Sequence, residues 1–527
     1  MKTLLGIALL SLAIKATAVS QPAAPAKRWL YLSSNLLVDE NVEKNAALLR
    51  RAKEAGYNGL LFTDFKLGFW WTREDMKDRY QKNALRFRGT VRDLGLELAV
   101  AVMPFGYANS WFLNDPNLAQ GVPIRDCPMI VENGELHPVP TIALENGSFE
   151  NHNGDKIANI SSQDGAGSLT FADTEVKHDG AVSLRMSPKE GEPQNVRIFR
   201  KLKVKPWQHY RIRCWLKADA LTADGVRAIV LAGEQSLQWQ FLSRDEGNGK
   251  LKRFEVAKNV TFGWTEQLVD FNSLGNSEVN LVIGMWNGKS GNLWLDELSI
   301  ESTPTLNLLR RDDLPFELKT ADGKLLKEGV DVEPVKDEKA GRDPSAGEFS
   351  TRHAPPVIRL AKDSALKNGD LVQLSGYHPH LVYNAQVNCS MLNPAIWKLA
   401  NDEVEQATKL LDPDIIFLSH DEIRSVGWEP DEQKFENAGA VIAENMRRSQ
   451  ATASKASGGK PLMVWSDMFD PSHNARKNFY LARGTVEGSW EGLEPSTGIM
   501  KWGIGNADKG LDFFSETGPQ DDGRRLL

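Results

Sequence analysis

The chain has 527 residues, of which 41% are hydrophobic and 25% charged, a composition typical of a globular protein with two to four domains. Its formal net charge of -7 gives no basis for binding nucleic acid or an anionic membrane surface. The three cysteines, Cys127, Cys214 and Cys389, lie far apart, so they permit one disulfide at most and no cysteine-based metal site; structural thiols are the simpler interpretation.

Residues 1–18 have the pattern of a secretory signal peptide. Lys2 supplies the positive start, residues 4–13 are apolar, and Ala16-Thr17-Ala18 fits a cleavage site of small residues. The apolar run is too short to span a bilayer, and no other segment reaches that length. Residues 19–27 form a leader. We therefore expect a secreted or periplasmic protein without an integral membrane segment after cleavage.

Residues 28–143 alternate between short apolar runs and helical periodicity. Strands are predicted at 29–35, 58–64 and 96–103, and two helices lie between them, the first capped by Asp39 and ended by Gly56. Such alternation indicates a parallel sheet with right-handed crossovers. This segment is predicted to be the first part of an α/β barrel.

Residues 144–302 show many short alternating runs and no long helix, which predicts an antiparallel sandwich inserted into the barrel. Its first residues, LENGSFE, and its last, GNLWLDELSI, resemble the end strands of carbohydrate-binding jelly rolls of the family 4/9/22 type. This resemblance implies a sugar-binding accessory module, with a structural calcium ion at Glu150 and Asp296. Two carboxylates alone are fewer ligands than calcium requires.

Residues 303–340 are predicted to form a β-hairpin around Asp322-Gly323, and residues 341–527 the second part of the barrel. Further parallel strands are expected at 370–375, 413–418, 461–467 and 498–502, with helices at 394–411, from Pro430, and at 474–483. The fold class is thus α/β, a (β/α)8-type barrel with an inserted jelly roll. Seven strands are counted, and the polar residues 518–527 do not supply an eighth. A single-base frameshift in the gene is one hypothesis for that missing strand.

Three predicted strands end in acidic residues: Asp64, the pair Asp421-Glu422, and Asp467. Barrel enzymes carry their catalytic groups at this end of the strands. Cleavage of a glycosidic bond needs a proton donor and a second carboxyl group, and repulsion between neighbouring carboxylates favours a protonated Glu422 with Asp421 as its partner. Asp467 is the third catalytic candidate. The alternatives are a capping role for Asp421 and an ion pair between Glu422 and Arg424.

A strand that ends in Asp-Glu resembles the signature of family 20 β-N-acetylhexosaminidases. The resemblance implies that Glu422 is the acid and that Asp421 orients a 2-acetamido group of the substrate. The residues before the pair are Leu418-Ser419-His420 rather than that family's Gly-Gly lead, and the pair falls on the fifth predicted strand rather than the fourth.

Other residues near the predicted rim combine aromatic rings with polar groups, as sugar sites do. Trp490 is equally well explained as a core residue, and Trp465 as part of the barrel interior. A zinc site at His378, His380 and Asp421 is a minor alternative. The predicted substrate-binding residues are Asp64, Tyr377, His378, His420, Arg424, Trp465, His473, Asn474, Trp490, Glu491 and Trp502.

The favoured function is an exported glycoside hydrolase that acts on oligo- or polysaccharides, N-acetylhexosamine-containing ones by the resemblance, without a catalytic cofactor. The alternatives are a non-catalytic polysaccharide-binding protein and a metal-dependent carbohydrate deacetylase. Glu422→Gln is expected to remove activity and to leave the melting temperature nearly unchanged.

Overall fold

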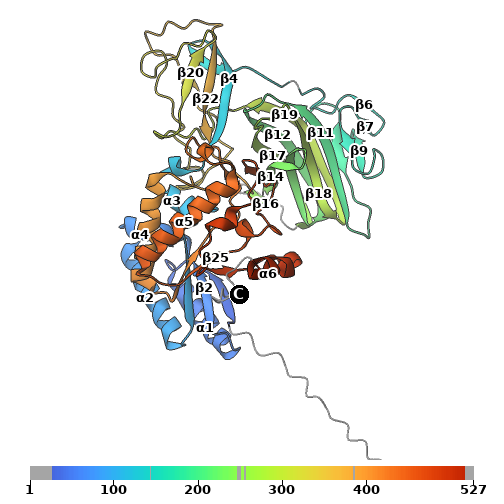
Figure 1. Cartoon of the computed structure of the whole chain (residues 1–527). Coiled ribbons are helices and arrows are strands. Elements are labelled where there is room, and N and C mark those ends of the chain that lie inside the picture. The colour runs from blue at the N-terminus through green and yellow to red at the C-terminus, as the bar shows by residue number, and fades with distance from the viewer. Residues whose placement is uncertain (1–26, 143, 246–250, 254–256, 384–385, 517–527) are drawn as a thin grey trace, which may run out of the picture.

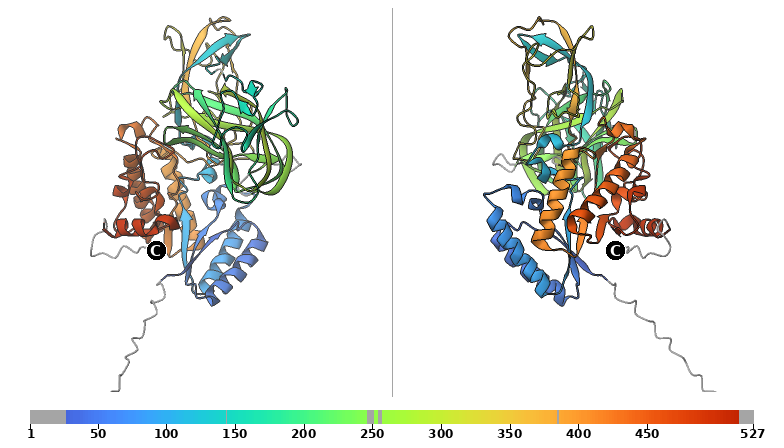
Figure 2. Two further views of the ribbon diagram at one scale, coloured as in Figure 1. Left: turned by 90° about the vertical axis from the view of Figure 1, so that its right-hand side faces the viewer. Right: turned by 60° about the vertical axis from the view of Figure 1, so that its left-hand side comes forward.

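The structure, a computed structural model, describes residues 27–142, 144–245, 251–253, 257–383 and 386–516. The predicted signal peptide, most of the leader and the polar C-terminal residues 518–527 lie outside these ranges. Figure 1 shows a parallel sheet with helices, a sandwich in green and a small antiparallel sheet above them. In both views of Figure 2, the sandwich and the small sheet lie in the upper part of the molecule, and the blue helices α1 and α2 lie in the lower part.

The parallel sheet contains six strands, and every neighbouring pair in it is parallel. In spatial order the strands are β1 (Trp29–Ser33), β2 (Gly59–Thr63), β3 (Glu97–Val102), β23 (Ile415–Leu418), β25 (Leu462–Trp465) and β27 (Gly498–Met500). The α-helices are α1 (Asp39–Glu54), α2 (Lys77–Asp93), α3 (Asn109–Phe112), α4 (Pro394–Leu411), α5 (Ala438–Ser457) and α6 (Ala507–Glu516).

This sheet is curled like part of a barrel. The rings of Tyr31 on β1 and Trp465 on β25 are 6.2 Å apart between centroids, although four strand spacings, roughly 19 Å in a flat sheet, separate their strands. Leu61, Phe417 and Met463 fill the interior between them. Within the described residues β1 and β27 do not pair, so the structure shows six strands of an open barrel and not the predicted closed (β/α)8 barrel.

The strand predicted at 370–375 exists, but it belongs to a separate antiparallel sheet rather than to the barrel. Along β22 (Leu371–His378), Val372 and Leu374 are buried while Leu371 and Gln373 are exposed. This alternation is typical of an antiparallel sheet with one solvated face. The sheet has the order β20 (Glu317–Thr320), β22, β4 (Val122–Glu132), β5 (Glu135–Pro138) and β21 (Ile358–Arg359). Sequence reasoning missed the hairpin of β4 and β5, although Asn133-Gly134 between them is a strong hairpin signal.

Helix α4 has the predicted bounds, whereas α5 begins later than predicted and the helix predicted at 474–483 is absent. α5 begins at Ala438 rather than Pro430, because the Asn437 side chain caps it by accepting the Ala440 N–H at 3.0 Å. Residues 474–483 form turns and the short strand β26 (Leu481–Ala482). The Asn474 N–H donates to the Asp467 carbonyl at 3.0 Å, which ties that segment to the rim instead of to a helix.

The inserted segment is the predicted sandwich of two five-stranded antiparallel sheets. One sheet contains β17 (Ala257–Asn272), β12 (His209–Ala223), β19 (Ser290–Ser302), β10 (Ser183–Met186) and β9 (Thr170–Asp173). The other contains β14 (Gln235–Phe241), β13 (Gly225–Ala232), β18 (Glu278–Gly288), β11 (Gln194–Lys203) and β8 (Ser161–Ser162). Short paired strands complete the description: β6 (His152–Asn153) with β7 (Lys156–Ile157), β15 (Ser243–Asp245) with β16 (Leu251–Arg253), and β24 (Ser425–Val426) with β26.

Buried polar bonds join the sandwich to the rest of the chain. The Gln238 side chain donates to the Leu381 carbonyl at 2.8 Å, and the Asn272 side chain donates to the Pro123 carbonyl at 3.0 Å. Both side chains are completely buried, so these bonds hold the sandwich against the loop after β22 and against β4.

The three cysteines are free and buried, as expected for structural thiols, and each lies in a different hydrophobic core. Cys389 belongs to the barrel core, Cys214 to the sandwich core, and Cys127 to the core of the antiparallel sheet. The helices that the structure describes include none that is both long and apolar enough to cross a membrane.

Candidate functional site

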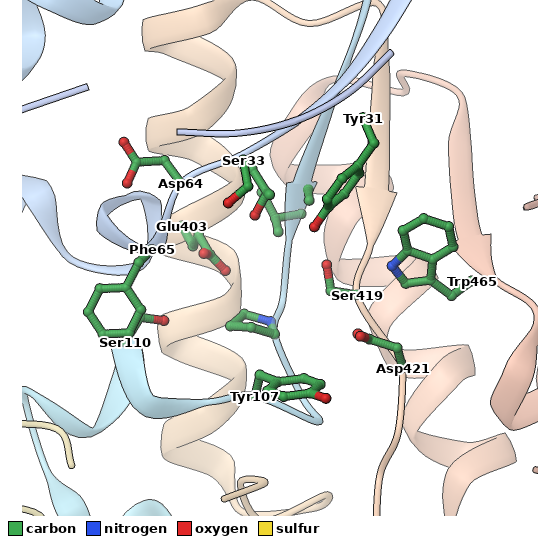
Figure 3. A pocket seen from close by; sticks show the side chains of 14 residues that line it. Tyr31, Ser33, Asp64, Phe65, Tyr107, Ser110, Glu403, Ser419, Asp421 and Trp465 are labelled. Carbon is green, nitrogen blue, oxygen red and sulfur yellow. The ribbon is translucent and has the colours of Figure 1, made fainter. Parts of the chain in front are cut away.

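A cavity of about 360 Å³ lies at the carboxyl ends of β1, β2, β3, β23 and β25. Figure 3 shows Tyr31, Ser419, Asp421 and Trp465 together on one side of it. This is the position where barrel enzymes place their catalytic groups. The complete lining is Tyr31, Ser33, Thr63, Asp64, Phe65, Ala101, Val102, Pro104, Tyr107, Ser110, Glu403, Ser419, Asp421 and Trp465.

Asp421 has the environment of a carboxyl group that keeps its proton. Burial raises its pKa from 3.8 to about 7, and the negative charges of Asp467 and Glu422 act in the same direction. Burial and the charge of Asp421 also raise the pKa of Tyr31. Asp421 is therefore able to hold or release a proton near neutral pH.

Gly106 keeps the backbone of Asp421 in place by close approach. A Cβ atom at this glycine would lie 1.8 Å from the Asp421 carbonyl oxygen. No other residue type fits there unless the loop after β23 moves.

Glu422 lies beside the cavity and is tied to it by three contacts. Its carboxylate forms an ion pair with Arg424 at 2.7 Å and accepts a hydrogen bond from the hydroxyl of Tyr107, a cavity residue. Its backbone N–H donates to Asp467 Oδ2 at 2.9 Å. The structure thus confirms the ion-pair alternative for Glu422.

Asp467 is completely buried, and its carboxylate accepts hydrogen bonds from several groups at the barrel rim. Besides the N–H of Glu422, it accepts hydrogen bonds from Asn474 Nδ2 at 2.8 Å and from Trp502 Nε1 at 3.1 Å. Burial raises its pKa, although these donors oppose the change. The rings of His473 and Trp502 pack edge to face at 4.7 Å. Three predicted residues, His473, Asn474 and Trp502, are therefore gathered around Asp467.

Asp64 lines the cavity, but its carboxylate forms hydrogen bonds to other groups of the protein. It accepts the N–H groups of Leu36 and Lys66 at 2.8 and 3.0 Å and the hydroxyl of Tyr80 at 3.1 Å. In Figure 3 the carboxylate points away from Asp421. Asp64 also caps the short 3-10 helix Phe65–Gly68, so its carboxylate has a structural role, and its predicted role in substrate binding stays a prediction.

Two predicted histidines lie in packed interiors. The ring of His420 is buried, and its Nε2 is 2.9 Å from Asn445 Oδ1 on α5. His378 lies at the sandwich interface, where its Nε2 is 2.9 Å from Asn272 Nδ2. Burial lowers the pKa of both rings, which fits neutral core histidines. The described residues include no group of three or more side chains arranged to hold a metal ion.

Three further predicted residues lie outside the cavity. Tyr377 is buried on β22, in the antiparallel sheet. Trp490 packs edge to face on Phe513 of α6, so the core interpretation applies to it. Glu491 is exposed in the 3-10 helix Ser489–Gly492.

Sequence reasoning missed Glu403, which lines the cavity from α4. It is 2% exposed, burial raises its pKa to about 8, and it accepts the Met103 N–H at 2.8 Å. The sequence pattern that could have revealed Glu403 is its spacing from Ala400 and Ala407, which places a charged residue on the buried face of the helix.

Glu150 and Asp296 both contact the turn at residues 178–182, which lies between them. Glu150 Oε1 accepts the Ala181 N–H at 2.9 Å, and Asp296 Oδ2 accepts the His178 N–H at 2.8 Å. The two ends of the sandwich segment are thereby brought together.

No family model matches the chain, and no curated protein matches it. Three of the solved structures that are similar to part of it are carbohydrate-binding modules. A CBM4 structure is 12% identical, covers 30% of this chain and 99% of its own, and has a TM-score of 0.20. The CBM22-1 xylan-binding domain of Xyn10C from Paenibacillus barcinonensis is 16% identical over 31% of this chain and 96% of its own, with a TM-score of 0.20. The family 11 module of cellulase Lic26A-Cel5E from Clostridium thermocellum is 14% identical over 31% and 96%, with a TM-score of 0.19. The sandwich is defined by its own strand order, because these TM-scores are low.

Proposed function

We propose that this protein is an exported glycoside hydrolase whose site lies at the rim of the open barrel. One observation carries the proposal: Asp421, Glu422 and Asp467 meet after the ends of β23 and β25, and Asp421 faces a cavity beside Tyr31 and Trp465. Two carboxyl groups with different proton affinities are what glycosidic cleavage needs.

In this proposal Asp421 gives its proton to the glycosidic oxygen, and Glu422, held by Arg424, is the second carboxyl group. Asp467 is a positioning residue, since it binds the backbone of Glu422. The rings of Tyr31 and Trp465 offer apolar surfaces to sugar faces. An N-acetylhexosamine substrate stays a proposal that rests on the Asp-Glu resemblance.

Turnover of aryl glycosides and of a polysaccharide panel tests this proposal. Asp421→Asn is expected to lower kcat by 10²–10⁴-fold, the usual contribution of a proton donor. Asp402→Asn is the matched control, because Asp402 pairs with Lys398 on the outer surface of α4. A fully active Asp421→Asn protein would contradict the assignment.

The strand order of the sandwich favours a second candidate, a polysaccharide-binding protein without catalysis. Binding of a polysaccharide without any turnover would support this candidate. Release of acetate that stops on addition of a chelator would instead support the metal-dependent deacetylase.

Calcium binding by the sandwich also stays a proposal. Glu150 and Asp296 supply two carboxylates at one turn, and calcium needs additional oxygen ligands from backbone carbonyls or water. Calorimetric melts with calcium and with EDTA test it, and identical melting temperatures would argue against a site.

A further inference from the structure

The outer face of one sandwich sheet carries arginines and tryptophans in neighbouring positions. Arg197 on β11 and Arg227 on β13 are both register partners of Gly284 on β18, one from each side. Their backbones are therefore roughly 10 Å apart, two strand spacings. Because Gly284 has no side chain, nothing from β18 stands directly between the two arginines.

Aromatic rings flank both guanidinium groups. Arg197 lies 5.1 Å from the centroid of Trp286, and Arg227 lies 4.9 Å from the same ring. On its other side Arg227 is 4.7 Å from the ring of Trp239. Rings at these distances hold a guanidinium group in place without neutralising its charge.

Neither arginine forms an ion pair within the part of the chain that the structure describes. Arg197 Nε donates to the neutral Gln163 side chain at 2.7 Å, and Arg227 Nε has no hydrogen-bond partner. The opposite sheet differs. There Arg213 is paired with Glu266, and Arg185 with Asp173 at 3.2 Å. The unneutralised arginines are thus a property of one face.

This face continues to the barrel rim. The ring of Trp239 is 4.7 Å from that of Tyr383, and Tyr383 is 4.5 Å from Arg424, the partner of Glu422. Arg424 itself is 3% exposed, so it closes the rim end of the series by packing on Tyr383 and does not contact a polymer directly. We call this continuous series the arginine–tryptophan row; it consists of Arg197, Trp286, Arg227, Trp239, Tyr383 and Arg424.

We propose that the arginine–tryptophan row binds a polysaccharide that carries carboxylate or sulfate groups and leads it to the rim. Guanidinium groups recognise both kinds of anion through paired N–H donors, and the rings give apolar contact to sugar. The positive row stands out in a chain whose net charge is -7. The inference names the substrate class of the rim site, and in that respect it rests on the proposed function.

Binding by the full-length protein is measured separately from turnover, by titration calorimetry with polygalacturonate, a sulfated galactan and a neutral galactan. Binding of one or both acidic polymers is expected, with an affinity that falls as salt is added. The acidic polymer that binds identifies carboxylate or sulfate as the recognised group. Arg227→Met and Arg197→Met are each expected to weaken binding at least tenfold.

Arg213→Met is the matched control, because it removes one positive charge from the opposite sheet. Arg227→Lys keeps the charge and tests the row if the methionine variant does not fold. Equal binding of the neutral galactan, an equal loss in Arg213→Met, or equal binding of single-stranded DNA would overturn the proposal. Loss of binding in the row variants without any detectable turnover by the parent would support the row and contradict the hydrolase.

Discussion

Asp421 and Glu422 are adjacent, yet the structure gives them different surroundings. Glu422 has a φ of +53°, in the left-handed region that few residues other than glycine adopt. Its side chain reaches Tyr107 and Arg424, while Asp421 lines the cavity. The sequence predicted the pair from its place after a buried strand. It predicted Glu422 as the protonated carboxyl, whereas in the structure burial raises the pKa of Asp421. The surroundings of the pair depend on Tyr107 and Asp467, which come from other segments of the chain.

The raised pKa of Asp421 predicts how its replacement changes stability with pH. Asp421 titrates near ~3.9 in the unfolded chain and at about 7 in the folded one. Its favourable contribution is complete below pH ~4 and is lost as the pH rises toward 7. The melting temperature of Asp421→Asn minus that of the parent is therefore expected to increase from pH 4 to pH 7. Calorimetric scans measure it, and a difference that falls with pH would contradict the assignment.

Glu422→Gln is expected to lower stability as well as activity, unlike the prediction from sequence. Arg424 is 3% exposed, so the substitution leaves a buried guanidinium group without its carboxylate. We expect a loss of about 1–3 kcal/mol in the free energy of unfolding, measured in urea, since Glu422 itself is partly exposed. Glu405→Gln, which breaks an exposed pair with Lys409, is the control and should cost no more than about 0.5 kcal/mol. Equal losses in the two variants would show that the Arg424 pair adds no stability.

At the scale of elements, local sequence patterns predicted where strands and helices lie better than they predicted which strands pair. α4 was predicted to the residue because Asn393 caps it and Pro394 begins it. β22 was predicted as a strand but assigned to the wrong sheet, since its partner β4 lies about 240 residues earlier. Its alternating burial pattern was the available signal for an antiparallel partner.

Gly106→Ala is expected to displace the loop after β23 and to reduce activity strongly. The added methyl group would overlap the Asp421 carbonyl oxygen at 1.8 Å, and backbone must move to relieve that overlap. Gly89→Ala is the matched control, because a Cβ atom at Gly89 on α2 meets nothing within 4 Å. Turnover and melting temperature of both variants measure the effect, and an unimpaired Gly106→Ala protein would show that the close approach is dispensable.

Residues 144–302, expressed alone, are expected to fold with a cooperative melt at a lower temperature than in the full chain. Nearly all of the sandwich core comes from its own strands. Separation, however, removes the partners of buried polar groups such as Gln238 and Asn272. Circular dichroism at increasing temperature checks this. A segment without a cooperative transition would show that the barrel is required for its folding.

At the scale of the whole molecule, the sequence predicted the parallel sheet, the insertion and the acidic rim. It did not predict that the sheet contains six strands, nor the antiparallel sheet formed by β4, β5, β20, β21 and β22. Periodicity shows which face of a strand is buried, whereas pairing between distant strands depends on contacts that no local window contains. The arginine–tryptophan row was missed for the same reason, as its members come from β11, β13, β14, β18 and two loops.

The placement of one thiol in each of three hydrophobic cores gives the protein three internal reporters of local opening. A thiol reagent reaches Cys389, Cys214 or Cys127 only when the barrel, the sandwich or the antiparallel sheet opens. Burial also raises the pKa of Cys127 and Cys214 to about 12, so the closed state holds almost no reactive thiolate. Labelling followed by peptide mass spectrometry would rank the opening free energies of the three parts without any engineered probe. Equal rates at all three positions would mean that they open as one cooperative unit.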